Sequence, residues 1–229
     1  MGLNVDSLPI VNGVFHPTDL SQASTVAFAH ALKLSLLWKT PISILHVAQR
    51  SDVNWADLPG LRDTLFRWGL IPDKNDKKAV TELGIRVRKV IVPQDDPVEA
   101  SIRFLERHPA DLIVLATHQR SGQMQWLRQS VSEPLARNTG EMTLFIPHGV
   151  SGFISLEDGT VSLKRILIPV DNDPDPASAI QAVYRIVKAM EVVEVQFTLL
   201  YIGDRMTCQQ SNSQSKLIGH GKSVLSRGM

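Results

Sequence analysis

The stretch "LIVLATHQRSGQMQWLRQSVSE" (residues 112–133) joins a short apolar run to a polar loop and then to a helical pattern. An apolar run of this length is typical of a buried strand in a parallel sheet. In α/β proteins the loop after such a strand often holds a phosphate at the start of the next helix. This loop contains Gly122 among four glutamines, although phosphate loops are usually rich in glycine. The stretch therefore predicts an α/β fold and leaves open whether its loop binds a nucleotide.

Strand and helix patterns alternate along the first two thirds of the chain. Asp19 or Ser21 can cap the helix that follows the first strand, and Asp96 with Pro97 begins the helix that follows the third. Alternation with short connections predicts an α/β fold in which a parallel sheet carries helices on both faces. The expected strands span residues 13–19, 42–48, 85–93, 111–117 and 142–147, and the expected helices span residues 21–38, 58–69, 76–83, 97–108 and 131–138.

The opening pattern recurs near the end of the chain. "RILIPVDNDPDPASAIQAVYRIVKAM" (165–190) matches "GVFHPTDLSQASTVAFAHALKL" (13–34), with Pro169 at the place of Pro17 and Asp171 at that of Asp19. Asp171 is expected to cap the repeated helix. "VQFTLLYIGD" (195–204) repeats the second strand, and the pattern then stops.

This repeat sets the expected organisation of the chain. We predict a complete domain at 10–147, a linker at 148–162, a partial repeat (strand, helix, strand) at 163–204 and a disordered tail at 205–229. Two strands cannot bury enough surface to be stable alone. The partial repeat is therefore expected to dock on the first domain or on another chain, or to be a relic of truncation.

Composition excludes several classes of function. A formal charge of +1 argues against a mainly electrostatic nucleic-acid binder. One cysteine, Cys208, fits a reducing compartment, and the N-terminus lacks the pattern of a signal peptide. No apolar stretch is long enough to span a membrane. We therefore expect a cytoplasmic protein with neither nucleic acid nor membrane as a partner.

The sequence offers little for catalysis or metal binding. The seven histidines show no metal-ligand spacing, and His46, inside a strand pattern, is expected to be a core residue. No nucleophile motif or pair of catalytic carboxylates is present. An apolar stripe fits either a lid on the core or a partner surface, with core packing as the default; its members are Trp55, Leu58, Leu61, Leu65 and Trp68.

In the order and spacing of its motifs, the chain resembles the universal stress protein family. The motifs are "HPTDLSQAS" (16–24), "ILHVA" (44–48), "DLIVLATHQRSG" (111–122), "SVSE" (130–133) and "LFIP" (144–147). The resemblance covers residues 10–147 and again 163–203, in the tandem arrangement common in this family. It implies an open, five-stranded, Rossmann-like parallel sheet, a homodimer formed through the last strand (142–147) or through the partial repeat, and a regulatory role. Some members bind ATP and others do not.

The resemblance also gives a position for each glycine of the family's ATP loop. Those glycines fall on Ala116, Gln119 and Gln129, and Ser130 follows at the family's next position. Glycine permits positive φ and lets backbone N–H groups approach phosphate oxygens closely. Replacing all three at intact spacing predicts weak or no ATP binding.

Other family positions are better preserved. Pro17, Thr18, Asp19 and Val47 match the adenine side, and Asp19 has an equal claim to be a helix cap. Ser130 and Glu133 form the pattern of a capping box, although a helix start at Ser132 suits Pro134 better. The candidate nucleotide-binding residues are Pro17, Thr18, Asp19, Val47, Ala116, Gln119, Arg120, Gln129, Ser130 and Val131.

Three functional hypotheses follow. The first is a non-catalytic regulatory or stress-response protein with a degenerate phosphate loop, weak or no ATP binding and no certain cofactor. The second is a sensor of the same family that binds ATP or AMP by its adenine side. The third is a nucleotide-handling α/β enzyme, which the missing glycines and missing metal ligands disfavour.

Overall fold

The computed structural model describes residues 11–48, 53–117, 131–171, 175–192 and 194–201. It divides into two units, Met1–Val161 and Ser162–Met229.

The first unit is built on a parallel sheet with the strand order β3-β2-β1-β4-β5. The strands are β1 (Val14–Thr18), β2 (Ile42–Ala48), β3 (Val87–Pro93), β4 (Leu112–Thr117) and β5 (Met142–Pro147). β1 is central, so the chain builds outward on one side through β2 and β3 and on the other through β4 and β5. The predicted five-stranded parallel sheet is confirmed.

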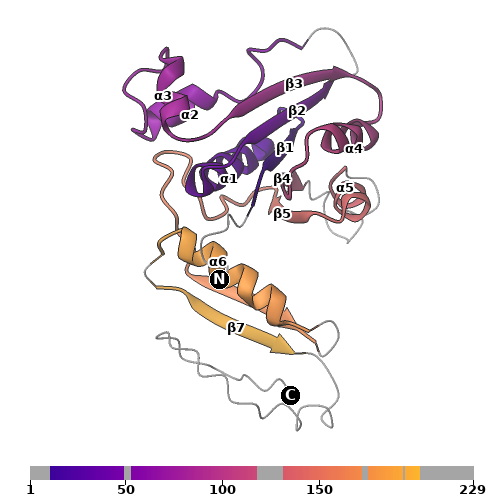
Figure 1. The fold of residues 1–229 in the computed structure, drawn as a ribbon, viewed down its shortest axis with the longest axis vertical. Coiled ribbons are helices and arrows are strands. Elements are labelled where there is room, and N and C mark those ends of the chain that lie inside the picture. Colours follow the sequence, from indigo (N-terminus) through magenta and orange to yellow (C-terminus); the bar gives the residue numbers. More distant parts are fainter. Residues whose placement is uncertain (1–10, 49–52, 118–130, 172–174, 193, 202–229) are drawn as a thin grey trace, which may run out of the picture. The chain divides into compact units, whose positions relative to one another are not determined.

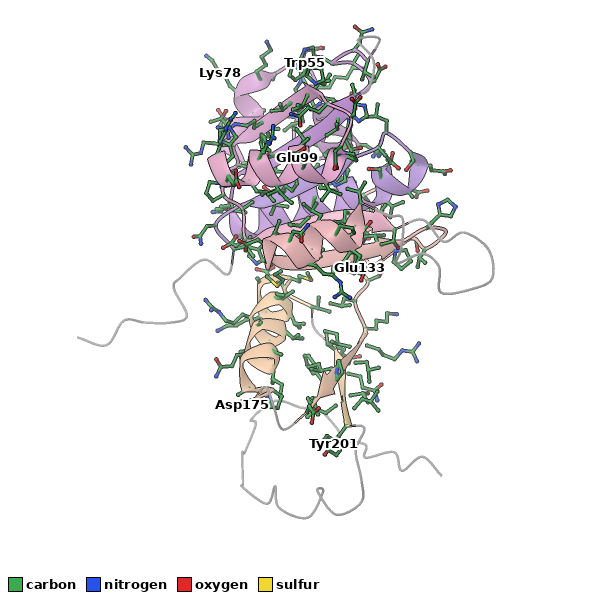
Figure 2. The ribbon with its side chains drawn as sticks, turned by 90° about the vertical axis from the view of Figure 1, so that its right-hand side faces the viewer. Trp55, Lys78, Glu99, Glu133, Asp175 and Tyr201 are labelled. Atoms are coloured by element: carbon green, nitrogen blue, oxygen red, sulfur yellow. The ribbon has the colours of Figure 1, made fainter. Side chains whose placement is uncertain are left out.

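Helices cover both faces of this sheet. α1 (Gln22–Trp38) contacts β1, β4 and β5, whereas α4 (Pro97–Arg107) and α5 (Ser132–Thr139) lie on the other side (Figure 1). Figure 2 looks onto that second face, with Glu99 on α4 and Glu133 on α5. Neighbouring residues of β1 point to opposite faces of the sheet. Phe15 stacks on Phe104 of α4, with 5.5 Å between ring centroids, whereas His16 faces Phe28 of α1, with 5.9 Å between ring centroids.

Two short helices, α2 (Leu61–Arg67) and α3 (Lys77–Glu82), connect β2 to β3. The apolar stripe of this segment is mostly core, because Leu58, Leu61, Leu65 and Trp68 are buried. Trp55 is 61% exposed and is the exception. Packing against the rest of the unit, and not the polar composition of residues 49–83, decides where these side chains lie.

Local hydrogen bonds explain where the main helices begin. Ser21 caps α1 by accepting a hydrogen bond from the backbone N–H of Ser24 (3.2 Å). Asp96 caps α4 through the N–H groups of Val98 (2.8 Å) and Glu99 (3.2 Å), with Pro97 in the first turn. Both starts agree with the caps that the sequence allows.

The segment predicted to be a linker packs on the first unit instead. We call residues 148–161 the strap. Its Ile154 is 2% exposed and forms an isolated antiparallel bridge with Val161. The side chains of Arg67 and Trp68 both donate to the carbonyl oxygen of Leu156, at 2.8 and 3.2 Å. The strap is therefore part of the fold of this unit.

A histidine of α1 fixes the middle of the strap. Nε2 of His30 accepts hydrogen bonds from the N–H groups of Phe153 (2.9 Å) and Ile154 (3.2 Å). Its Nδ1 then donates to the carbonyl of Val26 (2.8 Å). Burial lowers the pKa of His30, which favours the neutral ring that this arrangement requires.

The second unit consists of β6 (Arg165–Val170), α6 (Ala177–Ala189) and β7 (Gln196–Tyr201), and its two strands form a parallel pair. α6 begins after Pro176, and the side chain of Asp175 accepts from the N–H of Ala177 (3.0 Å). Asp171 lies six residues before this helix, so the prediction that it caps α6 is wrong. Leu167 and Leu199 are more than half exposed on the two strands. The docking or relic status of this unit stays a prediction.

Candidate functional site

The candidate site lies where the carboxyl ends of β1 and β4 meet. Strand order reverses at this point, and ligands of open parallel sheets bind in the crevice that such a reversal leaves. Pro17 and Thr18 end β1, Asp19 follows them, Val47 is near the end of β2 and Ala116 near the end of β4. Val131 precedes α5. The structure therefore places the described candidates near the carboxyl ends of the strands. Gln119, Arg120, Gln129 and Ser130 lie outside the described residues.

Asp19 sits in a tight turn after β1. Its Oδ1 accepts from the N–H of Ser21 (3.0 Å), and Leu20 between them has a φ of 64°. Because Ser21 is the cap of α1, the reading of Asp19 as that cap is wrong. The carboxylate is exposed and supports the turn from which α1 starts.

Thr18 is turned away from solvent. Its Oγ1 accepts from the hydroxyl of Ser24 (2.9 Å) and from the N–H of Leu20 (3.2 Å), and the residue is 6% exposed. Pro17 and Val47 are half-buried. Asp19 is therefore the most exposed of the four adenine-side candidates.

Two buried histidines form hydrogen bonds between neighbouring strands close to these strand ends. Nδ1 of His46 lies 2.8 Å from the carbonyl oxygen of Thr18, which confirms the expected core role of His46. His16 is fully buried, and its Nδ1 lies 2.8 Å from the carbonyl oxygen of Val114 in β4. In the part of the chain that the structure describes, Nε2 of His16 has no hydrogen-bond partner.

Burial also decides the charge of His16. It lowers the pKa to about 4, against the opposing effects of the Val114 hydrogen bond and of nearby Asp19. The ring is thus neutral at pH 7. Sequence reasoning did not single out His16, although a histidine inside the apolar run "VFHPT" (14–18) was a usable signal.

The phosphate side of the candidate site includes the start of α5. The helix begins at Ser132, after Val131, which provides no side-chain cap. Ser130, the first residue of the expected capping box, lies outside the described residues, so the box stays a prediction; Glu133 pairs with Arg137 (2.7 Å). This start places Pro134 in the first turn, where a missing N–H breaks no helical hydrogen bond.

The start of α5 is held against the end of β4. The hydroxyl of Ser132, which is 5% exposed, donates to the carbonyl oxygen of Ala116 at 3.3 Å. This polar group at the helix start is therefore directed to the protein's own backbone. Among the described residues, no group of three or more His, Cys, Asp or Glu side chains is placed to hold a metal ion.

The chain is similar to proteins of one known family. A model of the universal stress protein family matches residues 14–147. Universal stress protein MJ0577 of Methanocaldococcus jannaschii is 20% identical over 151 residues, which are 58% of this chain and 93% of that protein. Within the described ranges, no helix is both long and apolar enough to cross a membrane.

Two solved structures show how far the likeness extends. A universal stress protein from Archaeoglobus fulgidus DSM 4304 is 20% identical, with a TM-score of 0.52, over 85% of this chain and 68% of its own. This structure covers more of the chain than the family model does. At 20% identity the likeness shows a similar fold and nothing about function. A universal stress protein in complex with cAMP is 22% identical over 60% of this chain and 97% of its own, with a TM-score of 0.39, too low to transfer its ligand.

Proposed function

The chain belongs to the universal stress protein family, and on that premise we propose that it is a cytoplasmic, non-catalytic regulatory protein that binds ATP weakly or not at all. The residues on the phosphate side of the candidate site support this role.

The carrying observation is the loss of glycine at every family loop position. Ala116, Gln119 and Gln129 stand where ATP-binding members have glycine. A side chain at these positions restricts the backbone and occupies space that phosphate oxygens need. The hydroxyl of Ser132, a donor at the start of α5, is also engaged within the protein by the carbonyl of Ala116. These features support a site with little affinity for a triphosphate.

Restoring the glycines tests this proposal directly. Calorimetric titration of the wild-type chain with ATP and Mg²⁺ should give a Kd weaker than about 1 mM, equivalent to about −4 kcal/mol. The triple variant Ala116→Gly, Gln119→Gly, Gln129→Gly should bind at least about tenfold more tightly, a gain of about 1.4 kcal/mol. Micromolar ATP binding by the wild-type chain would overturn the proposal.

A matched control separates phosphate contacts from simple flexibility. Gln123→Gly with Gln125→Gly changes two glutamines of the same loop that lie off the family's glycine positions. This variant should bind ATP no better than the wild-type chain does. If it gains as much affinity as the triple variant, loop flexibility is the cause and the assignment of the glycine positions fails.

The second candidate function is an adenine-nucleotide sensor. The exposed carboxylate of Asp19 at the end of β1 favours it, since an acidic side chain there can accept a hydrogen bond from adenine or ribose. AMP binding that equals ATP binding and is lost in Asp19→Ala, which removes the acceptor, would select the sensor. Asp95→Ala provides a control at an exposed aspartate outside the site.

We further propose that the chain forms a homodimer through β5. β5 is an edge strand, and its Met142 and Phe145 are 38% and 39% exposed. Apolar side chains on an unpaired edge favour association with another strand. Pairing through the partial repeat is the alternative, and its exposed Leu167 and Leu199 are the feature that supports it.

A further inference from the structure

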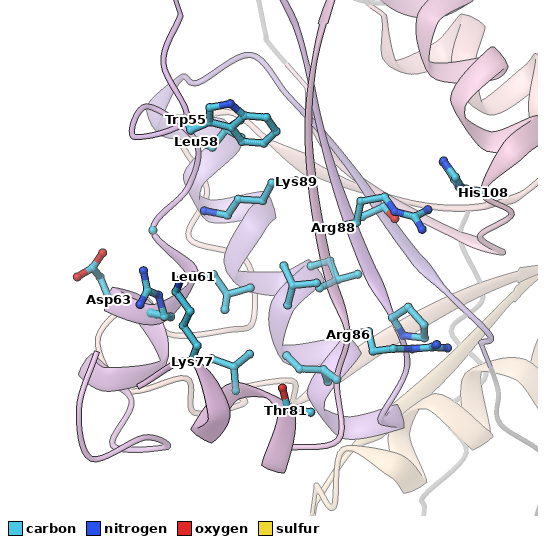
Figure 3. Close-up of a pocket in the computed structure, with 18 of the residues that line it drawn as sticks. Trp55, Leu58, Leu61, Asp63, Lys77, Thr81, Arg86, Arg88, Lys89 and His108 are labelled. Atoms are coloured by element: carbon cyan, nitrogen blue, oxygen red, sulfur yellow. The ribbon is translucent and has the colours of Figure 1, made fainter. Parts of the chain in front are cut away.

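A concave region lies beside β3, away from the candidate nucleotide residues. It is a pocket of about 1220 Å³ between the first residues of β3 and the segment 55–63 (Figure 3). The beginning of β2, α3 and the end of α4 complete its walls. Because it adjoins the amino-terminal half of β3, it shares no residue with the family's nucleotide-binding positions.

The charge of this pocket is strongly one-sided. Six of the chain's 24 Lys and Arg residues line it, compared with one of its 23 Asp and Glu residues, Asp63. The carboxylate of Asp63 lies 3.8 Å from Nζ of Lys74, a residue that does not line the pocket. A chain with a net charge of +1 therefore concentrates positive charge here. The six cationic residues are Arg62, Lys77, Arg86, Arg88, Lys89 and Arg107.

β3 also presents a free backbone edge to this region. The N–H of Ile42 in β2 donates to the carbonyl of Arg86 (2.8 Å), so the even-numbered residues of this stretch face β2. The N–H and C=O groups of a parallel strand alternate in direction from one residue to the next. Val87, Lys89 and Ile91 therefore point outward, and within the described ranges these backbone groups pair with no other strand.

The cations lie on both sides of that edge. Val90 and Val92 pack against the core under α4 and α5, so Arg88, on the same face, extends toward the end of α4. Lys89 projects to the opposite side of β3, as Figure 3 shows. Its Nζ donates to the carbonyl of Pro59 at 2.7 Å.

The surroundings of Lys89 disfavour its charged form. Burial lowers its pKa first, and the positive charge of Arg62 lowers it further, while Asp63 opposes the effect. An anionic group placed beside Lys89 and Arg62 would stabilise the charged form of Lys89. Arg86, Arg88 and Arg107 on the other side of the strand would need an anionic group of their own.

We propose that the edge of β3 is the docking site of an acidic peptide segment that binds in an extended conformation as an additional strand. A strand sends alternate side chains to opposite faces, so it can supply carboxylates to both groups of cations at once. A compact anion reaches one face only. Trp55, at the rim with buried Leu58 beneath it, offers a contact for an apolar side chain of the segment.

The same charges exclude other strands from this edge. A second copy of β3 would bring Arg86, Arg88 and Lys89 against their own counterparts, and like charges on facing strands repel. Cationic side chains on an edge strand oppose pairing in general. Only an acidic strand converts that repulsion into attraction, which makes the edge selective.

A defined peptide can test this assignment. The probe is fluorescein-labelled Val-Glu-Glu-Val-Glu-Glu-Val, which as a strand carries two glutamates on each face. Its binding to the full chain is followed by fluorescence anisotropy at low and physiological salt. One comparator has Lys in place of every Glu. A second has D-valine at the three valine positions, which keeps the charge but prevents a regular strand. Inorganic pyrophosphate is the compact anion.

The acidic all-L peptide should bind, and its affinity should fall with salt. The D-valine peptide should bind at least about tenfold more weakly, because it cannot pair along the edge. Hydrogen exchange measured by NMR should slow at the amides of Val87, Lys89 and Ile91. No binding by the acidic peptide, equal binding by the D-valine peptide, or unchanged exchange at these amides would overturn the proposal. Displacement by equimolar pyrophosphate would show a site for compact anions instead.

Neighbouring lysines of α3 provide a matched pair of variants. Lys77 lines the pocket and Lys78, the next residue, does not. Arg88→Glu should weaken peptide binding at least about tenfold because like charges then face each other. Lys77→Glu should weaken it in the same direction, and Lys78→Glu should leave it unchanged. If Lys78→Glu is as harmful as Arg88→Glu, net charge and not this edge governs binding, and the proposal fails.

Discussion

The buried histidine of β1 makes a quantitative prediction about stability and pH. His16 is fully buried, and burial lowers its pKa from 6.5 to about 4. Between these two values the unfolded chain binds a proton that the folded chain refuses, so acid favours unfolding. The difference between a pKa of 6.5 and one of about 4 corresponds to about 3 kcal/mol, at about 1.36 kcal/mol for each tenfold change in proton affinity. The contribution is fully present above pH 6.5 and is lost as the pH falls to about 4.

The comparison of wild-type chain with His16→Leu isolates this contribution. Leucine removes the titrating ring and also leaves the carbonyl of Val114 without its donor, which costs about 1–3 kcal/mol at every pH. The variant should therefore be less stable at pH 7 but should lose less stability on acidification. Other titrating groups, such as His30, are common to both proteins, and their effects cancel in the difference.

Urea unfolding at several values between pH 7 and pH 4 measures the effect. Tryptophan fluorescence is a suitable signal, since all four tryptophans lie within residues 1–161 and report the first unit. His148→Gln, at an exposed histidine, serves as the control and should follow the wild-type curve. A difference between wild-type chain and His16→Leu that stays constant within about 1 kcal/mol from pH 7 to pH 4 would refute the reasoning.

Three further predictions concern the strap, a helix cap and the dimer. Gly152 has a φ of 68°, and an added Cβ would collide with Nε2 of His30, so Gly152→Ala should cost about 2 kcal/mol or more in urea unfolding. Gly149→Ala, at a φ of 79° in open space, should cost only about 1 kcal/mol; equal losses would show that the strap contact is unimportant. Asp96→Ala should remove the cap of α4 and cost about 1 kcal/mol, while Asp95→Ala should cost less than about 0.5 kcal/mol in the same measurement. Phe145→Glu should convert a dimer into a monomer in light scattering after size-exclusion chromatography; a dimer of unchanged stability would exclude β5 as its interface.

The sequence predicts the sheet well because its signals are local. Each β-strand of the first unit is a short segment rich in apolar residues, and every observed strand lies within the range expected for it. Asp96 and Pro97 form an unambiguous start for α4, and the structure places the start there. Two aspartates mislead, because Asp19 supports a turn and Asp171 lies well before α6. Which polar residue becomes a cap depends on the turn geometry around it.

Contacts between distant residues set the limit of sequence reasoning. The strap was expected to be a linker, since it lies between the complete domain and the partial repeat. Its packing depends on His30, which precedes Phe153 by more than 120 residues. The pair Phe153 and Ile154 was the available local signal. The basic pocket was missed for the same reason, because α2, α3, β3 and α4, with the residue before β3, contribute its charges from separate segments.

The strap also changes where the first unit ends. A boundary drawn after Pro147, where the family match stops, would strip Ile154 from the core and deprive Nε2 of His30 of both its donors. An excised domain should therefore extend to Val161 to keep its native stability. Fusion partners, affinity tags and protease sites intended to separate the two units belong after that residue.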